Sequence, residues 1–216
     1  MIAKRTFKDA RYEAFSAVGK VFSSAKRLEI LDVLIQRPHS VDELATNLQQ
    51  SIASTSQHLQ VLKRANVVVA KRKGTTIIYR LAEGTLEVFV SLRALAENIS
   101  SDLQVLHQQS DIPTVTFEYV QHILKDSSAI LLDVRTETEF VHRRMNGAIN
   151  IPLSDLLNRS IELSTVKPII ITCRGPYCVS SHEAAHLLEH KGFQVSRYDD
   201  GIGEWFVQGG NLSGTL

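Results

Sequence analysis

The sequence predicts two domains: a mainly helical domain, followed by an α/β domain whose parallel sheet is covered by helices on both faces. Apolar residues recur at helical intervals in the first half, whereas short β-branched runs alternate with helical patterns in the second. The charge divides as well, since residues 1–110 hold 15 Lys and Arg against 10 Asp and Glu, and residues 111–216 hold 9 against 13. The expected first domain, polar linker (QQSDIPT) and second domain are 1–107, 108–114 and 115–216.

The first three helices are predicted from apolar spacing and from capping signals. The segments 7–22 and 23–36 keep apolar residues at helical intervals, and Pro38 ends the second of them. Ser40 and Glu43 form an S-x-x-E capping box, in which two side chains satisfy free N–H groups of the first turn. The short helix VDELATNL therefore begins after Ser40.

A fourth helix, a hairpin and a long last helix complete the first domain. Ser54 and Gln57 form a second box, S-x-x-Q, and Asn66 suits the left-handed residue after that helix. Two β-branched segments at 67–81 then surround a basic Gly turn, and a long helix is expected at 86–107. This order of helices and hairpin is that of a winged helix-turn-helix.

The second half alternates strands with helices. The helical patterns TETEFVHR, LSDLLN and SSHEAAHLLEHKG separate apolar runs that are typical of buried parallel strands. Ligands of such sheets gather beyond the carboxyl ends of the strands. The expected strands are 129–134, 147–152, 168–172 and 193–198.

Composition excludes membrane and secreted classes. No stretch approaches the ~20 apolar residues of a membrane span, and the start, MIAKRTFKDARYEAF, lacks the apolar block of a signal peptide. We expect a cytoplasmic protein with no membrane partner, in which thiols stay reduced. Two cysteines are too few for a disulfide framework, so they indicate chemistry. No cofactor is expected.

Both cysteines stand in one loop, CRGPYC. Cys173 follows the strand that ends at Thr172, and Cys178 precedes a helix expected to open near Ser180, where Ser180 and Glu183 form an S-x-x-E box. Backbone N–H groups of such a loop, aided by the helix N-terminus, form a nest for an anion. The loop is therefore a candidate reactive site.

Cys173 is the candidate nucleophile. A free thiol has a pKa of ~8.5, and lowering it by about two units stabilises the thiolate by ~2.7 kcal/mol. Charge-assisted N–H bonds and the adjacent Arg174 are expected to supply this, so no histidine base is needed. The other loop residues of the site are Gly175, Pro176 and Tyr177.

The second half resembles a single-domain rhodanese across essentially all of residues 112–216. The similarity lies in LLDVRTETEFVHRRMNGAINIPLSDL, IIITCRGPYCVSSHEAAHLLEHKGF and DDGIGEW. In that family a loop cysteine takes a sulfane sulfur as a persulfide and passes it to a thiophilic acceptor. The resemblance implies that Cys173 is this cysteine. The other matched positions are Asp133 and Arg135 of the DVR element, Gly201 and Trp205.

Loop length separates sulfur chemistry from related reactions. Phosphatases and arsenate reductases of similar design use Cys, five residues, then Arg, whose guanidinium clamps a tetrahedral oxyanion. Val179 stands at that place, so the cradle 173–178 fits a sulfur atom better than a phosphate. The rim differs from the family, because RRMN precedes Gly147 where Gly-His-Ile-x is usual. A rhodanese fold used only for binding is the alternative.

Cys178 is a candidate resolving thiol. It could attack a persulfide or sulfenate on Cys173 and form a disulfide or polysulfide bridge. The alternative is a small buried side chain that starts the helix. Both interpretations stay open.

A zinc signature is also present. HEAAH at 182–186 matches H-E-x-x-H, and His190 continues the same helix face. However, Ala184, Leu187 and Leu188 are expected on the buried side, which leaves the histidines on the solvated face. No distant third ligand is evident, so no metal is expected.

The first half resembles the ArsR-type winged-helix repressors over most of residues 1–105, through SIASTSQHLQVLKRANVV and AKRKGTTIIYRL. In such proteins the recognition helix enters the major groove of double-stranded DNA. A winged helix that serves only protein contacts is the alternative. The resemblance implies base contacts from Ser54, Ser56, Gln57 and Gln60 and phosphate contacts from Lys63, Lys71, Arg72 and Lys73, with His58 and Thr75 completing the DNA-binding set.

The resemblance also implies a homodimer. Family members dimerise through the first and last helices, which fits the apolar stripes of 7–22 and 86–106. A two-fold dimer predicts an inverted-repeat operator. Metal-sensing relatives carry Cys-x-Cys on the short helix, whereas this chain has ELATNL at 43–48, and its last helix lacks a paired His/Asp set. Metal sensing in this half is therefore not expected.

These features predict a dimeric transcriptional regulator, expected to be a repressor, whose rhodanese domain senses or transfers sulfane sulfur. Its expected partners are operator DNA and a small sulfane-sulfur donor or thiol acceptor. Two alternatives stay open: a thiosulfate or persulfide sulfurtransferase placed by its DNA-binding half, and a repressor that responds to arsenite or oxidants through its thiols. The sequence leaves enzymatic turnover undecided.

Overall fold

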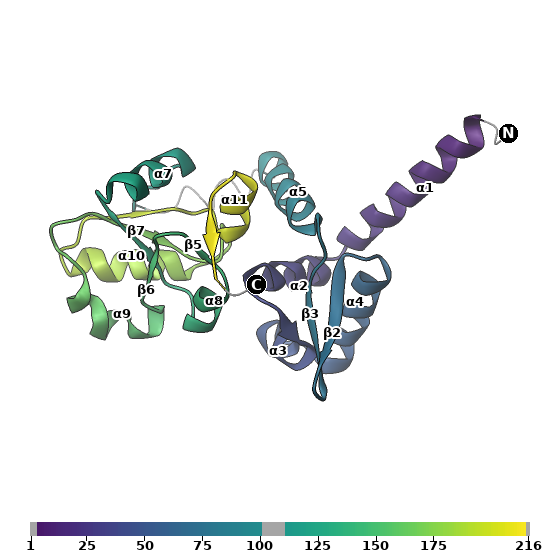
Figure 1. Cartoon of the computed structure of the whole chain (residues 1–216), viewed down its shortest axis with the longest axis horizontal. Coiled ribbons are helices and arrows are strands. Elements are labelled where there is room, and N and C mark those ends of the chain that lie inside the picture. The colour runs from purple at the N-terminus through teal and green to yellow at the C-terminus, as the bar shows by residue number, and fades with distance from the viewer. Residues whose placement is uncertain (1–3, 101–110, 215–216) are drawn as a thin grey trace. The chain divides into compact units, whose positions relative to one another are not determined.

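The computed structural model describes residues 4–100 and 111–214 (Figure 1). The chain divides into two compact units, 1–89 and 90–216. Part of the expected linker 108–114 lies outside the described residues, as does the end of the expected last helix. The division at residue 107 therefore stays a prediction.

The first unit has the order of a winged helix-turn-helix, as predicted. Its three strands form an antiparallel sheet in the order β1-β3-β2. The elements are α1 (Lys4–Phe22), α2 (Ala25–Gln36), β1 (His39–Ser40), α3 (Val41–Asn47), α4 (Ile52–Arg64), β2 (Val68–Lys73), β3 (Thr76–Leu81) and the beginning of α5 (Thr85–Ile99). Fully buried aliphatic side chains of α2, α3 and α4 form the core: Ile30, Leu31, Leu44, Leu59 and Leu62.

The N-terminal cap of α3 agrees with the prediction, whereas that of α4 differs from it. Ser40 Oγ accepts the N–H of Glu43 at 3.2 Å, and the Glu43 carboxylate accepts the N–H of Ser40 at 2.7 Å, which confirms that box. The predicted box at Ser54 is wrong, because Ser51 caps α4 and accepts the N–H of Ser54 at 3.2 Å. Ser54 therefore lies in the first turn. Asn66, at φ 56°, is left-handed as predicted.

The second unit is an α/β fold with a four-stranded parallel sheet in the order β6-β4-β7-β8, as the apolar runs predicted. A small antiparallel pair, β5-β9, accompanies it. After the end of α5, the elements are α7 (Phe117–Asp126), β4 (Ile130–Asp133), α8 (Glu137–His142), β5 (Arg144–Met145), β6 (Ile149–Asn150), α9 (Leu153–Arg159), the 3₁₀ turn η1 (Ser160–Glu162), β7 (Ile169–Thr172), α10 (Ser180–His190), β8 (Val195–Arg197), α11 (Ile202–Val207) and β9 (Leu212–Ser213).

Side chains of the central strands alternate between two covered faces. Leu132 of β4 packs with Ile169 and Ile171 of β7 and with Ala184 of α10 in one buried cluster. The intervening Ile170 is also buried, and strand geometry directs it to the opposite face. In Figure 1, α9 and α10 lie on one side of the sheet and α7 on the other. This layered arrangement places every β-to-α loop at the carboxyl edge of the sheet.

Two helices, α7 and α11, lie outside the predicted elements. Thr116 caps α7 by accepting the N–H of Tyr119 at 3.4 Å, a signal that is readable in the sequence. Helix α10 begins at Ser180 as expected, but Val179 is its N-cap and the predicted box with Glu183 does not form. Val179 already has a helical backbone, so the loop turns directly into the helix without a hydroxyl cap.

Candidate functional site

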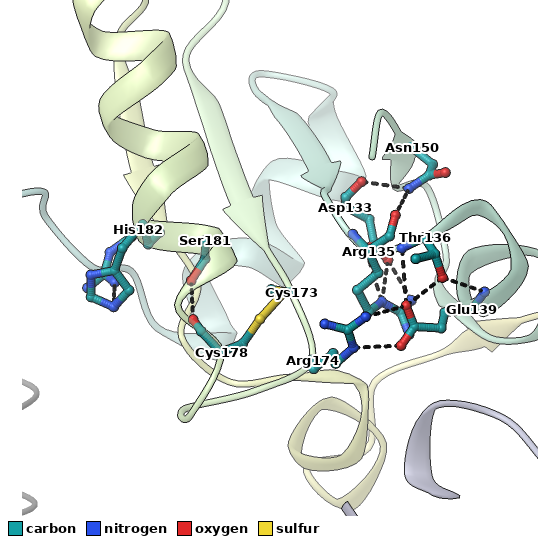
Figure 2. The surroundings of a disulfide bond; sticks show 11 residues. Asp133, Arg135, Thr136, Glu139, Asn150, Cys173, Arg174, Cys178, Ser181 and His182 are labelled. Atoms are coloured by element: carbon teal, nitrogen blue, oxygen red, sulfur yellow. Dashed lines mark hydrogen bonds and ion pairs between the residues drawn. A yellow bond between two sulfur atoms is a disulfide. The ribbon is translucent and has the colours of Figure 1, made fainter. Parts of the chain in front are cut away.

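The two cysteines close one loop at the carboxyl edge of the sheet. Cys173 directly follows β7, and Cys178 lies two residues before α10. Their sulfur atoms are joined as a disulfide, with Cα atoms 6.4 Å apart (Figure 2). The bridge makes residues 173–178 a closed ring of the protein chain.

Backbone contacts hold the ring in shape. Gly175 has φ 144°, a conformation that side-chain-bearing residues rarely adopt, and its carbonyl accepts the N–H of Cys178 at 3.0 Å. Ser181 of α10 donates its hydroxyl to the Cys178 carbonyl at 3.2 Å. Cys173 is buried, whereas Cys178 and Pro176 are half-buried and Tyr177 is exposed. The predicted loop residues are thus together, with unequal access to solvent.

Arg174 turns toward α8 and forms an ion pair with Glu139 (Figure 2). Its Nε and Nη2 atoms donate to the carboxylate at 2.6 and 2.9 Å. Burial raises the pKa of Glu139, but the hydrogen bonds and charge of Arg174 outweigh it, so this pKa lies below its ordinary value. Because the negative charge of Glu139 partly cancels the field of Arg174, Arg174 stabilises a thiolate at Cys173 less than the sequence suggested.

Asp133 and Arg135 form a buried ion pair beside the loop. The sheet register pairs Asp133 with Thr172, the residue before the nucleophile candidate. Arg135 Nη2 donates to Asp133 at 2.5 Å and to the Arg143 carbonyl at 2.8 Å. The Asn150 amide donates to the carbonyls of Asp133 and Arg135 at 2.8 and 2.9 Å, a contact that sequence reasoning missed. These bonds fix the neighbouring β4–α8 loop.

The start of α11 packs against the cysteine loop. A Cβ atom at Gly201 would collide with the carbonyl group of Arg174 and lie 2.8 Å from Cα of Gly175. The Gly201 N–H donates to the buried Glu204 carboxylate at 3.1 Å, and Glu204 also pairs with Arg93 within the second unit. Glu204 is a site residue that sequence reasoning missed, although the G-x-x-E spacing signals a helix start.

The Gly201→Ala variant is therefore expected to lose stability. The added methyl forces the loop backbone to move, and overpacking of this kind costs ~1–3 kcal/mol. Urea unfolding of the full chain measures the loss. Gly19→Ala is the matched control, because nothing lies within 4 Å of a Cβ there and the site is helical, so stability should not fall. Equal stability of both variants would contradict the close approach.

Trp205 anchors α11 from the other side. Its indole N–H donates to the Asn211 carbonyl at 3.0 Å, and its ring meets Phe117 and Tyr198 edge to face. The matched tryptophan thus lies in an aromatic cluster that positions α11. Trp205 thus supports the cysteine loop indirectly, through the position of α11.

His182 and His186 of the HEAAH stretch, and His190 after it, differ in their exposure to solvent. His186 and His190 are exposed, as expected, and Ala184 is buried. His182 corrects the expectation, because it is half-buried and its ring contacts the buried guanidinium of Arg197. No cluster of three or more His, Cys, Asp or Glu side chains suited to a metal occurs among the described residues.

The expected base-reading residues lie on α4, together with His58 and the expected phosphate contact Lys63. Gln57, Gln60 and Lys63 are exposed, whereas Ser54, Ser56 and His58 are half-buried. Arg64 is exposed on the same face, since it follows Gln57 by seven residues and Gln60 by four. Arg64 was not among the predicted contacts, although this helical spacing makes it a further candidate.

The other expected phosphate contacts, Lys71, Arg72 and Lys73, lie on the β2–β3 hairpin and are exposed, as is Thr75 in its turn. Because side chains alternate along a strand, Lys71 and Lys73 share one face and Arg72 points to the other. Arg72 Nε donates to the Gly74 carbonyl at 3.1 Å. The hairpin therefore has basic side chains on both faces, with Lys71 and Lys73 on one and Arg72 on the other.

An exposed apolar stripe follows α1. Phe7, Tyr12, Phe15 and Val18 are between 41% and 74% exposed in a single chain. Within the described part of the chain, no helix is long and apolar enough to cross a membrane. A stripe of this size on one helix is typical of an interaction surface.

Comparisons with known proteins cover both units. The model described as "Bacterial regulatory protein, arsR family" matches residues 24–69, and that of the rhodanese-like domain matches 116–208. The HTH-type transcriptional regulator Rv0324 of Mycobacterium tuberculosis is 32% identical over 94% of this chain and 91% of its own length. The putative sulfur carrier protein YrkF of Bacillus subtilis is 27% identical over 71% of this chain and 88% of its own.

A solved structure is similar to the first unit. The solution structure of the homodimeric winged helix-turn-helix domain Mb0332 of Mycobacterium bovis is 31% identical, with a TM-score of 0.43. It covers 46% of this chain, which covers 94% of that domain. Since similarity to Rv0324 extends over nearly the whole length of both proteins, the chain belongs to the HTH-type transcriptional regulators, with an arsR-family domain followed by a rhodanese-like domain.

Proposed function

We propose that this regulator is a repressor whose rhodanese-like domain takes a sulfane sulfur onto Cys173 and thereby lowers its affinity for operator DNA. The observation that carries the proposal is the meeting of the chain's only two cysteines in the loop between β7 and α10. The Glu139–Arg174 ion pair ties that loop to α8, and the Asp133–Arg135 pair fixes the neighbouring β4–α8 loop. The name of YrkF, a putative sulfur carrier protein, supports the sulfur chemistry.

The proposed reaction uses both thiols. The Cys173 thiolate attacks the outer sulfur of a donor such as thiosulfate, so that Cys173 becomes a persulfide and sulfite leaves with the bonding electron pair. The Cys178 thiolate then attacks the Cys173 sulfur of the persulfide. This forms the Cys173–Cys178 disulfide and expels the outer sulfur, which takes one proton from solvent and leaves as hydrosulfide, so that atoms and charge balance in both steps. Cys178 is thus proposed as the resolving thiol.

The DNA contacts are proposed for the first unit. The apolar stripe of α1 supports a two-fold dimer, which would place two copies of α4 on an inverted repeat. Exposed Gln57 and Gln60 suit adenine edges, and the exposed lysines of the hairpin suit phosphates.

Two DNA variants should therefore behave differently. Gln57→Ala is expected to lose ~1–3 kcal/mol of discrimination at one base pair, since a base contact is removed. Lys73→Ala should weaken binding to all sequences and reduce the salt slope by about 1. Fluorescence anisotropy at several salt concentrations measures both, on duplexes that the full-length protein selects from a random library. Similar effects of the two variants on every sequence would contradict these assignments.

Operator binding with and without a sulfane donor tests the proposed function. The pre-reduced, full-length protein should bind the selected duplex about 5- to 150-fold more weakly after thiosulfate or polysulfide, a coupling of ~1–3 kcal/mol. Arsenite serves as a second arm. Release by arsenite but not by either donor would instead support thiophile binding across the two cysteines.

A sulfurtransferase placed by its DNA-binding half is the second candidate, supported by the relative named as a sulfur carrier. That function predicts multiple turnovers of thiosulfate with a thiol acceptor and operator binding that does not change. Unchanged binding in a chain that still takes up sulfur would thus favour the enzyme over the sensor.

A further inference from the structure

The bridged loop exposes its two cysteines unequally. Cys173 belongs to the buried core cluster of the second unit and is 3% exposed. Cys178 is only partly buried, and its chain neighbours Tyr177 and Val179 are 52% and 67% exposed. A thiol that arrives from solvent therefore has access to the Cys178 side of the bridge.

Access decides which sulfur of a disulfide is attacked. The incoming thiolate bonds to one sulfur while the other leaves as a thiolate. Attack at Cys178 frees the Cys173 thiolate, the group that receives sulfur in the proposed function. Attack at Cys173 would instead leave that group blocked by the incoming thiol. The direction of opening thus determines whether the loop is ready for a donor.

We infer that a thiol reductant reopens the loop by attacking Cys178, and that the bridged chain accepts no sulfane sulfur before this step. Only the second statement rests on the proposed function. In the first exchange the reductant's thiolate bonds to the Cys178 sulfur and the Cys173 thiolate leaves. A second thiolate attacks the reductant's own sulfur in this mixed disulfide, and Cys178 leaves and takes a proton from solvent. Two thiols become one disulfide, and their two electrons reduce the bridge.

This order makes the response to sulfur conditional on thiol supply. A donor acts only on a chain that a thiol has already opened, and resolution by Cys178 closes the loop again. The partner is therefore a thiol reductant, and glutathione is the probe of choice because it is small enough to test access alone.

The sequence allows the attacked sulfur to be identified directly. Arg174 lies between the two cysteines, so trypsin separates them into the peptides 160–174 and 175–191. The oxidised full-length protein is exposed briefly to glutathione, quenched in acid, alkylated and digested. Mass spectrometry then shows which peptide carries glutathione.

At the earliest times, the adduct on 175–191 should exceed that on 160–174 by about tenfold or more. Cys173→Ser cannot form the bridge, and any adduct on it reports contaminating glutathione disulfide. Equal adducts, or a majority on 160–174, would overturn the assignment, as would an oxidised wild type without the bridge.

A second arm tests the order of events. Thiosulfate given to the bridged protein should add no sulfur to either peptide, whereas Cys178→Ser, which cannot form the bridge, should take one sulfur atom onto 160–174 without prior glutathione. Sulfur uptake by the bridged protein would disprove the closed state. If no reduced form takes up sulfur, the proposed function fails, yet the position of the glutathione adduct still decides the site of attack.

Discussion

Cys173→Ser is expected to abolish sulfur uptake and, with it, the release of operator DNA by sulfane donors. A serine hydroxyl is not ionised at neutral pH and forms no persulfide, so the loss should be complete. Sulfur uptake is measured as added mass on the peptide 160–174, and release by anisotropy of a bound duplex. The affinity of the untreated variant for DNA should stay near that of the reduced wild type.

Cys178→Ser is the matched control within the same loop. It keeps the nucleophile candidate but removes the resolving thiol, so the persulfide should accumulate and hydrosulfide release should stop. Operator release by the donor in Cys173→Ser would show that the response begins elsewhere in the chain.

Asp133→Asn is expected to destabilise the second unit by about 3–5 kcal/mol, the usual effect of removing one partner of a buried ion pair. Arg135 is fully buried and keeps its charge, so the neutral amide leaves that charge uncompensated. Chemical unfolding followed by Trp205 fluorescence reports on this unit, because the only tryptophan of the chain lies there.

Glu162→Gln provides the comparison for Asp133→Asn. It removes a surface ion pair with Arg159, whose side chain is also well exposed, and should hardly change stability. Wild-type stability in Asp133→Asn would contradict the structural role assigned to the buried pair.

Local signals in the sequence predicted most of the fold. The Ser40–Glu43 box, the left-handed Asn66 and the hairpin depend on residues close together in the chain, and all three are present. The predicted N-cap of a helix was wrong where two residues of one turn both suit that position. Ser51 and Ser54 both suit a cap, and the structure uses Ser51. At α10 the loop backbone made a hydroxyl cap unnecessary.

The surroundings of the cysteine loop were harder to predict, because they depend on distant residues. Glu139 meets Arg174 from 35 positions away, and the Asn150 amide reaches across to Asp133 and Arg135. Spacing in the sequence gives no information about such contacts. Helix α11 shows the same limit, since Gly201 was recognised by resemblance, whereas its close approach to the Arg174 backbone arises only in the folded chain.

The most direct test of the central claim measures two quantities in the same samples. Reduced full-length protein on its operator duplex is titrated with a sulfane donor, while mass spectrometry follows the sulfur state of Cys173 and anisotropy follows bound DNA. We expect DNA release to increase in proportion to the fraction of Cys173 that has become persulfide or bridge. Full conversion of Cys173 with the duplex still bound at its original affinity would contradict the account.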